Sequence, residues 1–367
     1  MRQKRIPSLD GLRGIAILLV LVNHLAGAHY FLSQPVMARL GDLGNLGVRL
    51  FFVISGFLIT RLLLNEFAAT QRISLKAFYI RRMLRIFPAF YVFIMVATVL
   101  AGFGFASLDR EDLLYSVTYT MNYYSNFTPN YSLRHLWSLS VEEQFYLLWP
   151  VTLALLTPAR AGRILIGVIL AVPVLRVVLY MAWPAYELLA NTGFEGVCDA
   201  LATGCLLAVG MRRLLHVEWF SRLLVGRAFP LLFAAIWIAN GLRDHPKFFW
   251  LVCVPFLNGA LALTVLRYVH APELALGRIL NRQPLTTIGV LSYSLYLYQQ
   301  LFLIQGRPVT AVFMAFPLNL AMAFLCAALS YRFVEQPFLR LKERFERMPA
   351  RMIETRVPTT TLSAPVR

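Results

Sequence analysis

The sequence has 367 residues, of which 59% are hydrophobic and 14% are charged, and it carries a formal net charge of +17. Soluble domains are nearer half apolar and a quarter charged, so the composition excludes an ordinary soluble globular domain. A basic excess of this size would suggest nucleic-acid binding in a soluble protein. In so apolar a chain, the first question is whether the positive charges lie on one side of a membrane.

Long apolar segments recur along the chain, and one membrane crossing requires roughly 20 apolar residues. The first segment follows a basic stretch without a small-residue cleavage site, so we expect an uncleaved transmembrane helix. The sequence therefore predicts an all-α, polytopic membrane protein in residues 1–342, and a basic, disordered cytoplasmic tail in 343–367. About ten spans are expected, at 12–30, 45–66, 86–105, 135–156, 164–182, 194–211, 228–241, 248–266, 285–304 and 309–332.

The positive charges show a strong sidedness when the loops alternate from a cytoplasmic N-terminus. Of the 35 Lys and Arg residues, 24 fall in predicted inside segments, 6 in outside loops and five within or at the ends of spans. Basic residues concentrate in cytoplasmic loops, so the pattern predicts an even number of spans with both termini in the cytoplasm. Membrane topology thus accounts for the net charge, and we expect no nucleic-acid partner.

The cysteines do not form a metal or disulfide pattern. They lie in apolar runs without a CxxC pair or an accompanying histidine cluster, so we predict buried core residues and no metal site. The four are Cys198, Cys205, Cys253 and Cys326.

Two ionisable residues lie within the first span, where a charge is costly and is often functional. Arg13 and His24 are eleven residues apart, which places them on one helical face about 16 Å apart along the axis. We expect Arg13 near the cytoplasmic surface and His24 deep in the membrane. From these residues alone, a snorkelling arginine with a hydrogen-bonded interior histidine is equally consistent.

The fourth span contains a second group of ionisable residues. His135 and Glu142 are seven apart and would share a helical face, and Glu143 adjoins Glu142. A buried carboxylate can orient a histidine as a base. Alternatively, this stretch lies at the outer interface with both glutamates in water.

Two further segments leave alternatives open. Arg81, Arg82 and Arg85 precede the third span, where arginines are usually topology anchors but can also bind phosphate groups. The segment 119–131 is rich in Tyr and Asn, which suits sugar binding as well as an interfacial aromatic belt.

Together these segments resemble the integral-membrane acyltransferase-3 family over about residues 5–342. His24 follows Arg13 with the family's Arg-x10-His spacing, and Arg82 and Arg85 match its Arg-x-x-Arg segment. Seven motifs occur in the expected order: SLDGLRGIAILLVLVNH, GVRLFFVISGFLIT, RRMLRIFPAFY, HLWSLSVEEQFYLLWP, DALATGCLLA, SYSLYLYQQ and YRFVEQPFLRL.

The resemblance implies an O-acyltransferase of the bacterial inner membrane with no tightly bound cofactor. It implies that an acyl group, usually acetyl, passes from cytosolic acyl-coenzyme A to a hydroxyl of a cell-envelope or secreted carbohydrate. Many relatives continue into a hydrolase-like domain that we do not find in this sequence, so we expect any second transfer step to need a separate periplasmic transferase.

The same resemblance implies roles for particular residues. His24 would act as general base or carry the acyl group, supported by Glu142 or Glu143 and by His135, with Arg13 also in the catalytic group. Arg13, Arg82 and Arg85 would hold the donor's phosphates. We assign acceptor binding to Asp10, Ser140, Tyr293 and Gln299.

The sequence departs from the family at two of its motifs. Gln299 stands where many relatives have histidine, and Cys198 where an arginine often precedes the residue matching Asp199. The first departure puts an auxiliary histidine role in doubt.

Three alternatives remain from the sequence. Buried Arg, His and Glu side chains also build the substrate pathways of transporters and flippases, although no repeated halves are evident. A scaffold within an export complex would not need His24. Within the enzyme class, the acceptor could instead be a small molecule or a lipid.

Overall fold

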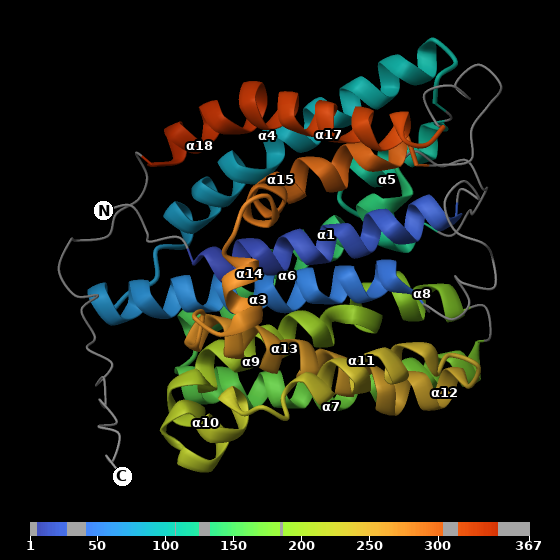
Figure 1. The fold of residues 1–367 in the computed structure, drawn as a ribbon. Coiled ribbons are helices and arrows are strands. Elements are labelled where there is room, and N and C mark those ends of the chain that lie inside the picture. Colours follow the sequence, from blue (N-terminus) through green and yellow to red (C-terminus); the bar gives the residue numbers. More distant parts are fainter. Residues whose placement is uncertain are drawn as a thin grey trace.

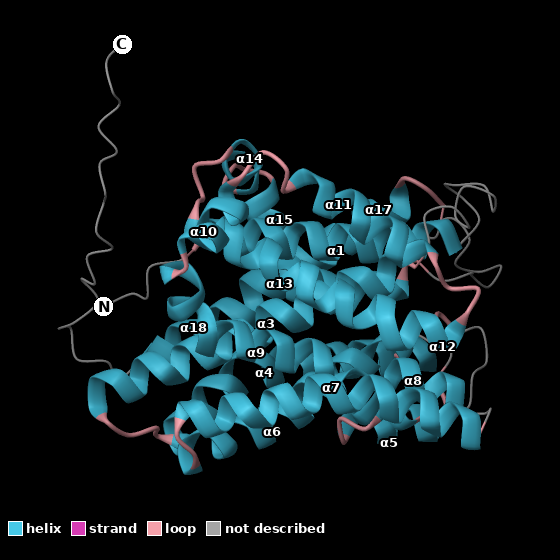
Figure 2. Cartoon of the chain, turned by 90° about the horizontal axis from the view of Figure 1, so that it is seen from below, coloured by secondary structure: helices cyan, strands magenta, loops and turns pink. Residues whose placement is uncertain are grey.

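The computed structural model describes residues 6–27, 42–106, 108–124, 133–183, 186–303 and 315–343. These residues form helices and connecting loops, with no strand among them (Figure 2). The predicted all-α class is therefore confirmed. The predicted tail, 343–367, lies almost entirely outside the described residues.

The helices follow one another with short connections. The first half contains α1 (Pro7–Gly27), α3 (Leu43–Thr70), α4 (Leu75–Gly102), α5 (Arg110–Val117), η1 (Met121–Tyr123), η2 (Arg134–Leu136), α6 (Trp137–Leu155) and α7 (Pro158–Ala182). The middle contains α8 (Glu187–Thr192), α9 (Phe194–His216), α10 (Glu218–Val225), α11 (Pro230–Gly241), α12 (Pro246–Phe248), the π-helical turn η4 (Phe249–Cys253) and α13 (Val254–His270). The last part contains α14 (Ala275–Leu280), α15 (Leu285–Tyr298), η5 (Gln299–Leu301), α17 (Leu318–Ser330), the π-helical turn η7 (Tyr331–Glu335) and α18 (Gln336–Glu343).

Each of the ten predicted spans contains a helix. Seven helices of the described chain are long and apolar enough to cross a membrane, or eight if the bent pair α10 and α11 forms one span. The other two predicted spans correspond to α6, of 19 residues, and α15, of 14 residues. The chain is thus a multi-pass membrane protein, and its exact number of crossings stays a prediction.

Several helix starts follow from local sequence. The side chains of Asp42, Ser74 and Thr157 accept hydrogen bonds from the first-turn backbone N–H groups of α3, α4 and α7. Such caps satisfy donors that have no partner within the helix. In α7 the cap precedes Pro158, whose missing N–H suits the first helical position.

The long helices lie side by side, and the short ones gather at the two ends of the bundle (Figure 1). The segments α10 and α14, which the charge pattern places inside, are at one end, which we call the α10 end. The segments α5, α8 and α12, which it places outside, are at the other, the α8 end. The arrangement agrees with the predicted alternation of loops.

Close backbone contacts hold the centre of the bundle together. A Cβ added at Gly289 on α15 would overlap the carbonyl oxygen of Asp10 on α1, and one at Gly204 on α9 would overlap that of Val53 on α3. Small residues allow such close approach of membrane helices. The α1–α15 contact matters for the site because α1 carries His24 and Gln299 directly follows α15, at the start of η5.

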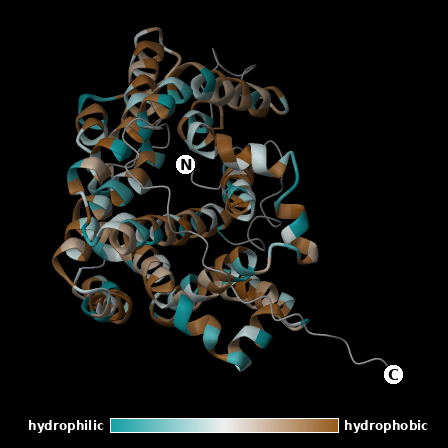
Figure 3. Cartoon of the chain, turned by 90° about the vertical axis from the view of Figure 1, so that its left-hand side faces the viewer, coloured by the Kyte–Doolittle hydropathy of each residue, from teal (hydrophilic) through white to brown (hydrophobic). Residues whose placement is uncertain are grey.

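Large apolar side chains also cover the outside of the bundle. Hydrophobic positions dominate the helices when the bundle is viewed from the α10 end (Figure 3). Exposed examples include Leu147 on α6, Leu170 on α7 and Leu231 on α11. Many exposed large apolar side chains of this kind indicate contact with lipid or protein, as a multi-pass membrane protein requires.

Candidate active site

A hydrogen bond joins His24 to Gln299 near the α8 end of the bundle. His24 lies in the last turn of α1, and its Nδ1 is 2.6 Å from the Oε1 atom of Gln299. Because an amide oxygen can only accept, Nδ1 carries the proton in this bond. The amide nitrogen of Gln299 donates to Gln300 at 3.3 Å, which agrees with that orientation. The neutral imidazole therefore keeps a free lone pair on Nε2.

His135 lies close to this pair in η2, just before α6. Its Nε2–H group donates to the carbonyl oxygen of Leu297 at 3.0 Å, and its ring contacts Phe93 and Tyr296. The side chain is buried, and Nδ1 has no hydrogen-bond partner among the described residues. His24 and His135 are near enough to interact electrostatically.

Both glutamates of the fourth span face an arginine instead of a histidine. Arg82 on α4 lies 3.7 Å from Glu142 and 3.5 Å from Glu143, and all three side chains are at most 20% exposed. This arrangement differs from the expectation that one glutamate orients a histidine. It also differs from the alternative in which water solvates both glutamates at the outer interface, because Arg82 of α4 supplies a counter-charge to them.

Two hydroxyl groups extend the arginine–glutamate group. Tyr146 donates to Glu142 at 3.1 Å and accepts a hydrogen bond from Ser55 on α3. The guanidinium carbon of Arg82 is 3.4 Å from the centre of the Tyr146 ring. Because α4 begins at Leu75, Arg82 lies within the helix and contacts residues of α6, and its role as a topology anchor stays a prediction.

A third group contains the two other predicted donor-binding residues. Arg13 on α1 and Arg85 on α4 are near enough to act on one another electrostatically, and both act on the buried Glu335 of η7. Ser294 on α15 donates a hydrogen bond to Glu335. The structure thus brings Arg13 and Arg85 together, and adds an acid to which the sequence assigned no role.

The predicted acceptor-binding residues do not form one group. The Ser140 hydroxyl donates to the Leu136 carbonyl at 3.0 Å within its own helix. The Tyr293 hydroxyl donates to the Ile86 carbonyl at 3.0 Å and joins α15 to α4. Asp10 lies in the first turn of α1, at the opposite end from Gln299. Acceptor binding by these four residues stays a prediction.

The tyrosine- and asparagine-rich segment is described as far as Tyr124. Tyr123 is 40% exposed at the α8 end and donates to Glu195 at 3.0 Å. Burial and this neighbouring carboxylate raise the pKa of Tyr123 to about 12. The rest of the segment, 125–131, lies outside the described residues.

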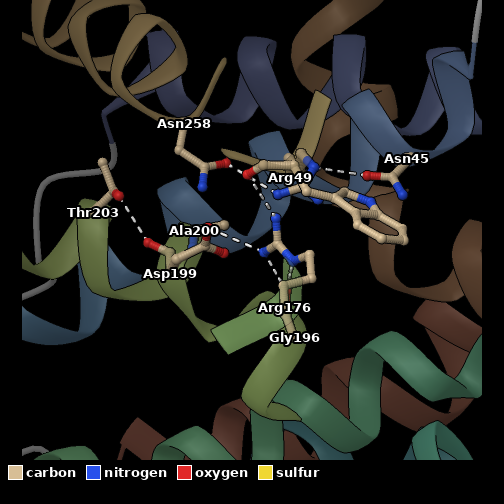
Figure 4. Close-up of polar contacts among 9 residues, drawn as sticks. Asn45, Arg49, Arg176, Gly196, Asp199, Ala200, Thr203 and Asn258 are labelled. Atoms are coloured by element: carbon tan, nitrogen blue, oxygen red, sulfur yellow. Dashed lines mark hydrogen bonds and ion pairs between the residues drawn. The ribbon is translucent and has the colours of Figure 1, made fainter. Parts of the chain in front are cut away.

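The sequence did not reveal a buried charged cluster between α3, α7, α9 and α13 (Figure 4). Arg176 forms a 3.2 Å ion pair with Asp199, and these side chains are 0% and 1% exposed. Arg176 also donates to the carbonyl oxygens of Gly196 and Trp250. Next to it, Arg49 donates to Asn45 at 2.8 Å and to Asn258 at 3.3 Å.

The cluster supplies Asp199 with a positive partner although Cys198, not an arginine, precedes it. That partner is Arg176 of α7. The sequence signal for this cluster is a charged residue inside an apolar span, which is costly and therefore notable. Arg49, Arg176 and Asp199 all fall within predicted spans. Their pairing could not be found from spacing, as the partners lie on different helices.

Comparison with known proteins identifies the family of this chain. A family model described as an acyltransferase domain matches residues 6–332, which is most of the sequence. No solved structure matches. The family assignment favours the acyltransferase hypothesis over the transporter and scaffold alternatives.

Three curated bacterial relatives resemble the chain over nearly its whole length. The peptidoglycan O-acetyltransferase OatA of Listeria monocytogenes is 29% identical over 91% of this chain and 56% of its own length. A provisionally named O-acetyltransferase of Staphylococcus aureus is 31% identical over 92% and 58%, and a provisionally named peptidoglycan O-acetyltransferase of Bacillus subtilis, YrhL, is 29% identical over 90% and 54%. The chain therefore spans little more than half the length of these relatives. On the family match, this chain belongs to the acyltransferase domain family.

Proposed function

We propose that the protein transfers an acetyl group from cytosolic acetyl-coenzyme A to a hydroxyl of a cell-envelope or secreted carbohydrate, within the bacterial cytoplasmic membrane. The observation that carries the proposal is the hydrogen bond from His24 Nδ1 to Gln299 Oε1. It leaves Nε2 as a free base, held in orientation by a second group, which is the arrangement that acyl transfer to a hydroxyl requires.

The proposed reaction needs one base and one proton path. Nε2 of His24 takes the proton of the acceptor hydroxyl as its oxygen attacks the thioester carbonyl. The carbon–sulfur bond then breaks, and the departing coenzyme A thiolate takes that proton from His24. An acyl-histidine intermediate, formed by direct attack of Nε2 on the thioester, is the alternative route.

The donor's phosphates would bind at Arg13 and Arg85. Arg82, by contrast, is already paired with two carboxylates and stacked on Tyr146, so it would position α4 and α6 instead of holding phosphate. Arg13 and His24 share the same face of α1 about 16 Å apart along the axis. The uncharged pantetheine arm would extend along that face toward His24.

The acceptor would be a carbohydrate, for which the names of the relatives give the main support, since two of them are named for peptidoglycan. A small molecule or a lipid is the alternative acceptor. A separate periplasmic transferase would be a partner if the acetyl group needs a second carrier.

Donor binding can be tested with Arg85→Ala in protein reconstituted into vesicles. Loss of a phosphate contact should raise the KM for acetyl-coenzyme A by about tenfold, with kcat changed far less. Arg72→Ala is the matched control, because Arg72 is an exposed arginine at the same end of the bundle. An unchanged donor KM in Arg85→Ala would contradict donor binding at this site.

The acceptor can be identified by mass spectrometry of envelope and secreted glycans from a deletion strain. We expect a carbohydrate to lose an acetyl mass and to regain it with the wild-type gene but not with the His24→Ala variant. Glycans that are identical in all three strains, with a lipid or small molecule losing the acetyl group instead, would contradict a carbohydrate acceptor.

A further inference from the structure

Glu335 is a buried acid that no predicted role explains. It ends the π-helical turn η7, is 7% exposed, and lies just beyond residues 6–332 that match the family model. Burying a carboxylate away from water is unfavourable unless other groups compensate it. Turns of π-helix inside α-helices are frequent at functional sites, so both the residue and its backbone setting call for an explanation.

Two neighbouring residues of α15 contact Glu335 and the backbone next to Arg85, one each. The Ser294 hydroxyl donates to one of its oxygens, and the Tyr293 hydroxyl donates to the carbonyl of Ile86 at 3.0 Å. Ile86 directly follows Arg85 on α4. Helix α15 therefore holds the acid of η7 and the arginine-bearing turn of α4 in a fixed relation to each other.

The charges of Arg85 and Arg13 both act on Glu335. Neither arginine forms an ion pair with it at 4 Å or less within the described residues, so the carboxylate offsets their charge without occupying their donors. The guanidinium groups stay available to an incoming anion.

Counted as formal charges, Arg82 with Glu142 and Glu143 sums to one negative charge, whereas Arg13 and Arg85 with Glu335 sum to one positive charge. The two groups also act on each other, since Arg13 acts on Glu142 and Arg82 acts on Arg85. Without Glu335, the formal charge of the second group would rise from one positive charge to two. Coulomb attraction for a phosphate would then be considerably stronger.

Attraction that is too strong is a disadvantage for this kind of donor. Acetyl-coenzyme A and the coenzyme A that remains after transfer carry the same phosphates. A phosphate site therefore binds substrate and product alike, and contacts that hold both equally do not speed the chemical step. An acid beside the arginines would weaken both complexes and allow the product to leave.

We propose that Glu335 sets the net charge of the Arg13–Arg85 pair, so that the anionic donor binds reversibly and spent coenzyme A is released. Glu335 is thus a positioning residue that acts through the phosphate-binding arginines. The proposal deepens the donor site proposed above and rests on it.

The test compares Glu335→Gln with wild type in vesicles, measuring the donor KM and the inhibition constant of free coenzyme A. The amide is isosteric and keeps an acceptor for Ser294, so we expect both constants to fall by about tenfold. Glu335→Asp should restore values near wild type. Glu218→Gln, an exposed carboxylate on α10, should change neither constant.

Two results would overturn this inference. An unchanged pair of constants in Glu335→Gln, or constants that rise, would mean that the acid only holds the fold or directly aids binding. The Arg85→Ala measurement keeps the two proposals separate. If Arg85→Ala raises the donor KM but Glu335→Gln leaves product inhibition unchanged, the donor site stands and the role of Glu335 does not.

Discussion

His24 depends on one neighbouring side chain for its orientation. The bond from Nδ1 to Gln299 selects the tautomer whose Nε2 can accept a proton. A neutral amide holds the ring without adding charge, unlike the carboxylate of a catalytic triad. Glutamine at this position is therefore compatible with the proposal of a single catalytic histidine.

Replacing Gln299 tests this role directly. Gln299→Leu removes the acceptor for Nδ1–H and frees the other tautomer, so we expect kcat to fall about 10- to 100-fold with little change in donor KM. Gln299→Glu keeps an acceptor and should retain most of the activity. Steady-state kinetics in vesicles measure both variants. Equal losses in the two variants would show that the amide does not act through the histidine.

Charged side chains join helices α4 and α6, and neither helix alone supplies a counter-charge for its own buried charges. Arg82 faces two carboxylates and the ring of Tyr146. Breaking a buried ion pair by removing one partner is much more costly than replacing all members by neutral groups. The two glutamates of α6 therefore depend on Arg82 of α4 for a counter-charge in the folded protein.

Arg82→Met should therefore destabilise the protein by about 3 kcal/mol, since two like charges would remain without a counter-charge. The triple variant Arg82→Met, Glu142→Gln and Glu143→Gln should recover much of that loss. Thermal unfolding in detergent measures both, with Arg222→Ala, from an exposed ion pair on α10, as a control with unchanged Tm. A triple variant less stable than Arg82→Met would contradict this account.

The contact between α1 and α15 can be tested through glycine. Gly289→Ala would place a Cβ against the Asp10 carbonyl, so we expect a lower Tm and lower activity as the two helices separate. Gly259→Ala on α13 meets nothing within 4 Å and should be neutral or stabilising, because alanine favours helix. Equal effects of the two substitutions would rule out close packing as the cause.

The sequence predicted the helices and their order because apolar length and charge sidedness are local properties. It also singled out Arg13, His24 and Arg85 as candidate site residues, since charged groups in a bilayer are costly, and their roles stay predictions. It could not predict their partners. Glu142 pairs with Arg82 from a distant helix, and His24 with Gln299, 275 residues away. His24 lies in the last turn of α1, which runs from Pro7 to Gly27, and its depth in the membrane stays a prediction.

The whole molecule has two chemically different ends, and the charge pattern assigns them to the two sides of a membrane. Short helices α10 and α14 lie at one end, and α5, α8 and α12 at the other (Figure 1). The proposed donor-binding arginines near the first end and His24 near the second would let a cytosolic donor meet an acceptor from outside. This account requires that the α10 end faces the cytoplasm.

Cysteine labelling tests that orientation. Glu111→Cys on α5 should react with a membrane-impermeant maleimide in intact cells, and Arg222→Cys on α10 only after permeabilisation. The native cysteines are free and predicted to be core residues; Cys198, Cys205 and Cys253 are buried and Cys326 is partly buried, so unmodified protein supplies the background. The opposite labelling pattern would invert the topology.

The central claim is that His24 drives acetyl transfer from coenzyme A across this bundle. The most direct measurement supplies radiolabelled acetyl-coenzyme A on the cytoplasmic side of vesicles and follows label on a carbohydrate acceptor enclosed at the opposite side. We expect transfer by wild type and none by a His24→Ala variant that inserts and unfolds thermally like wild type. Transfer at the wild-type rate by His24→Ala would contradict the account.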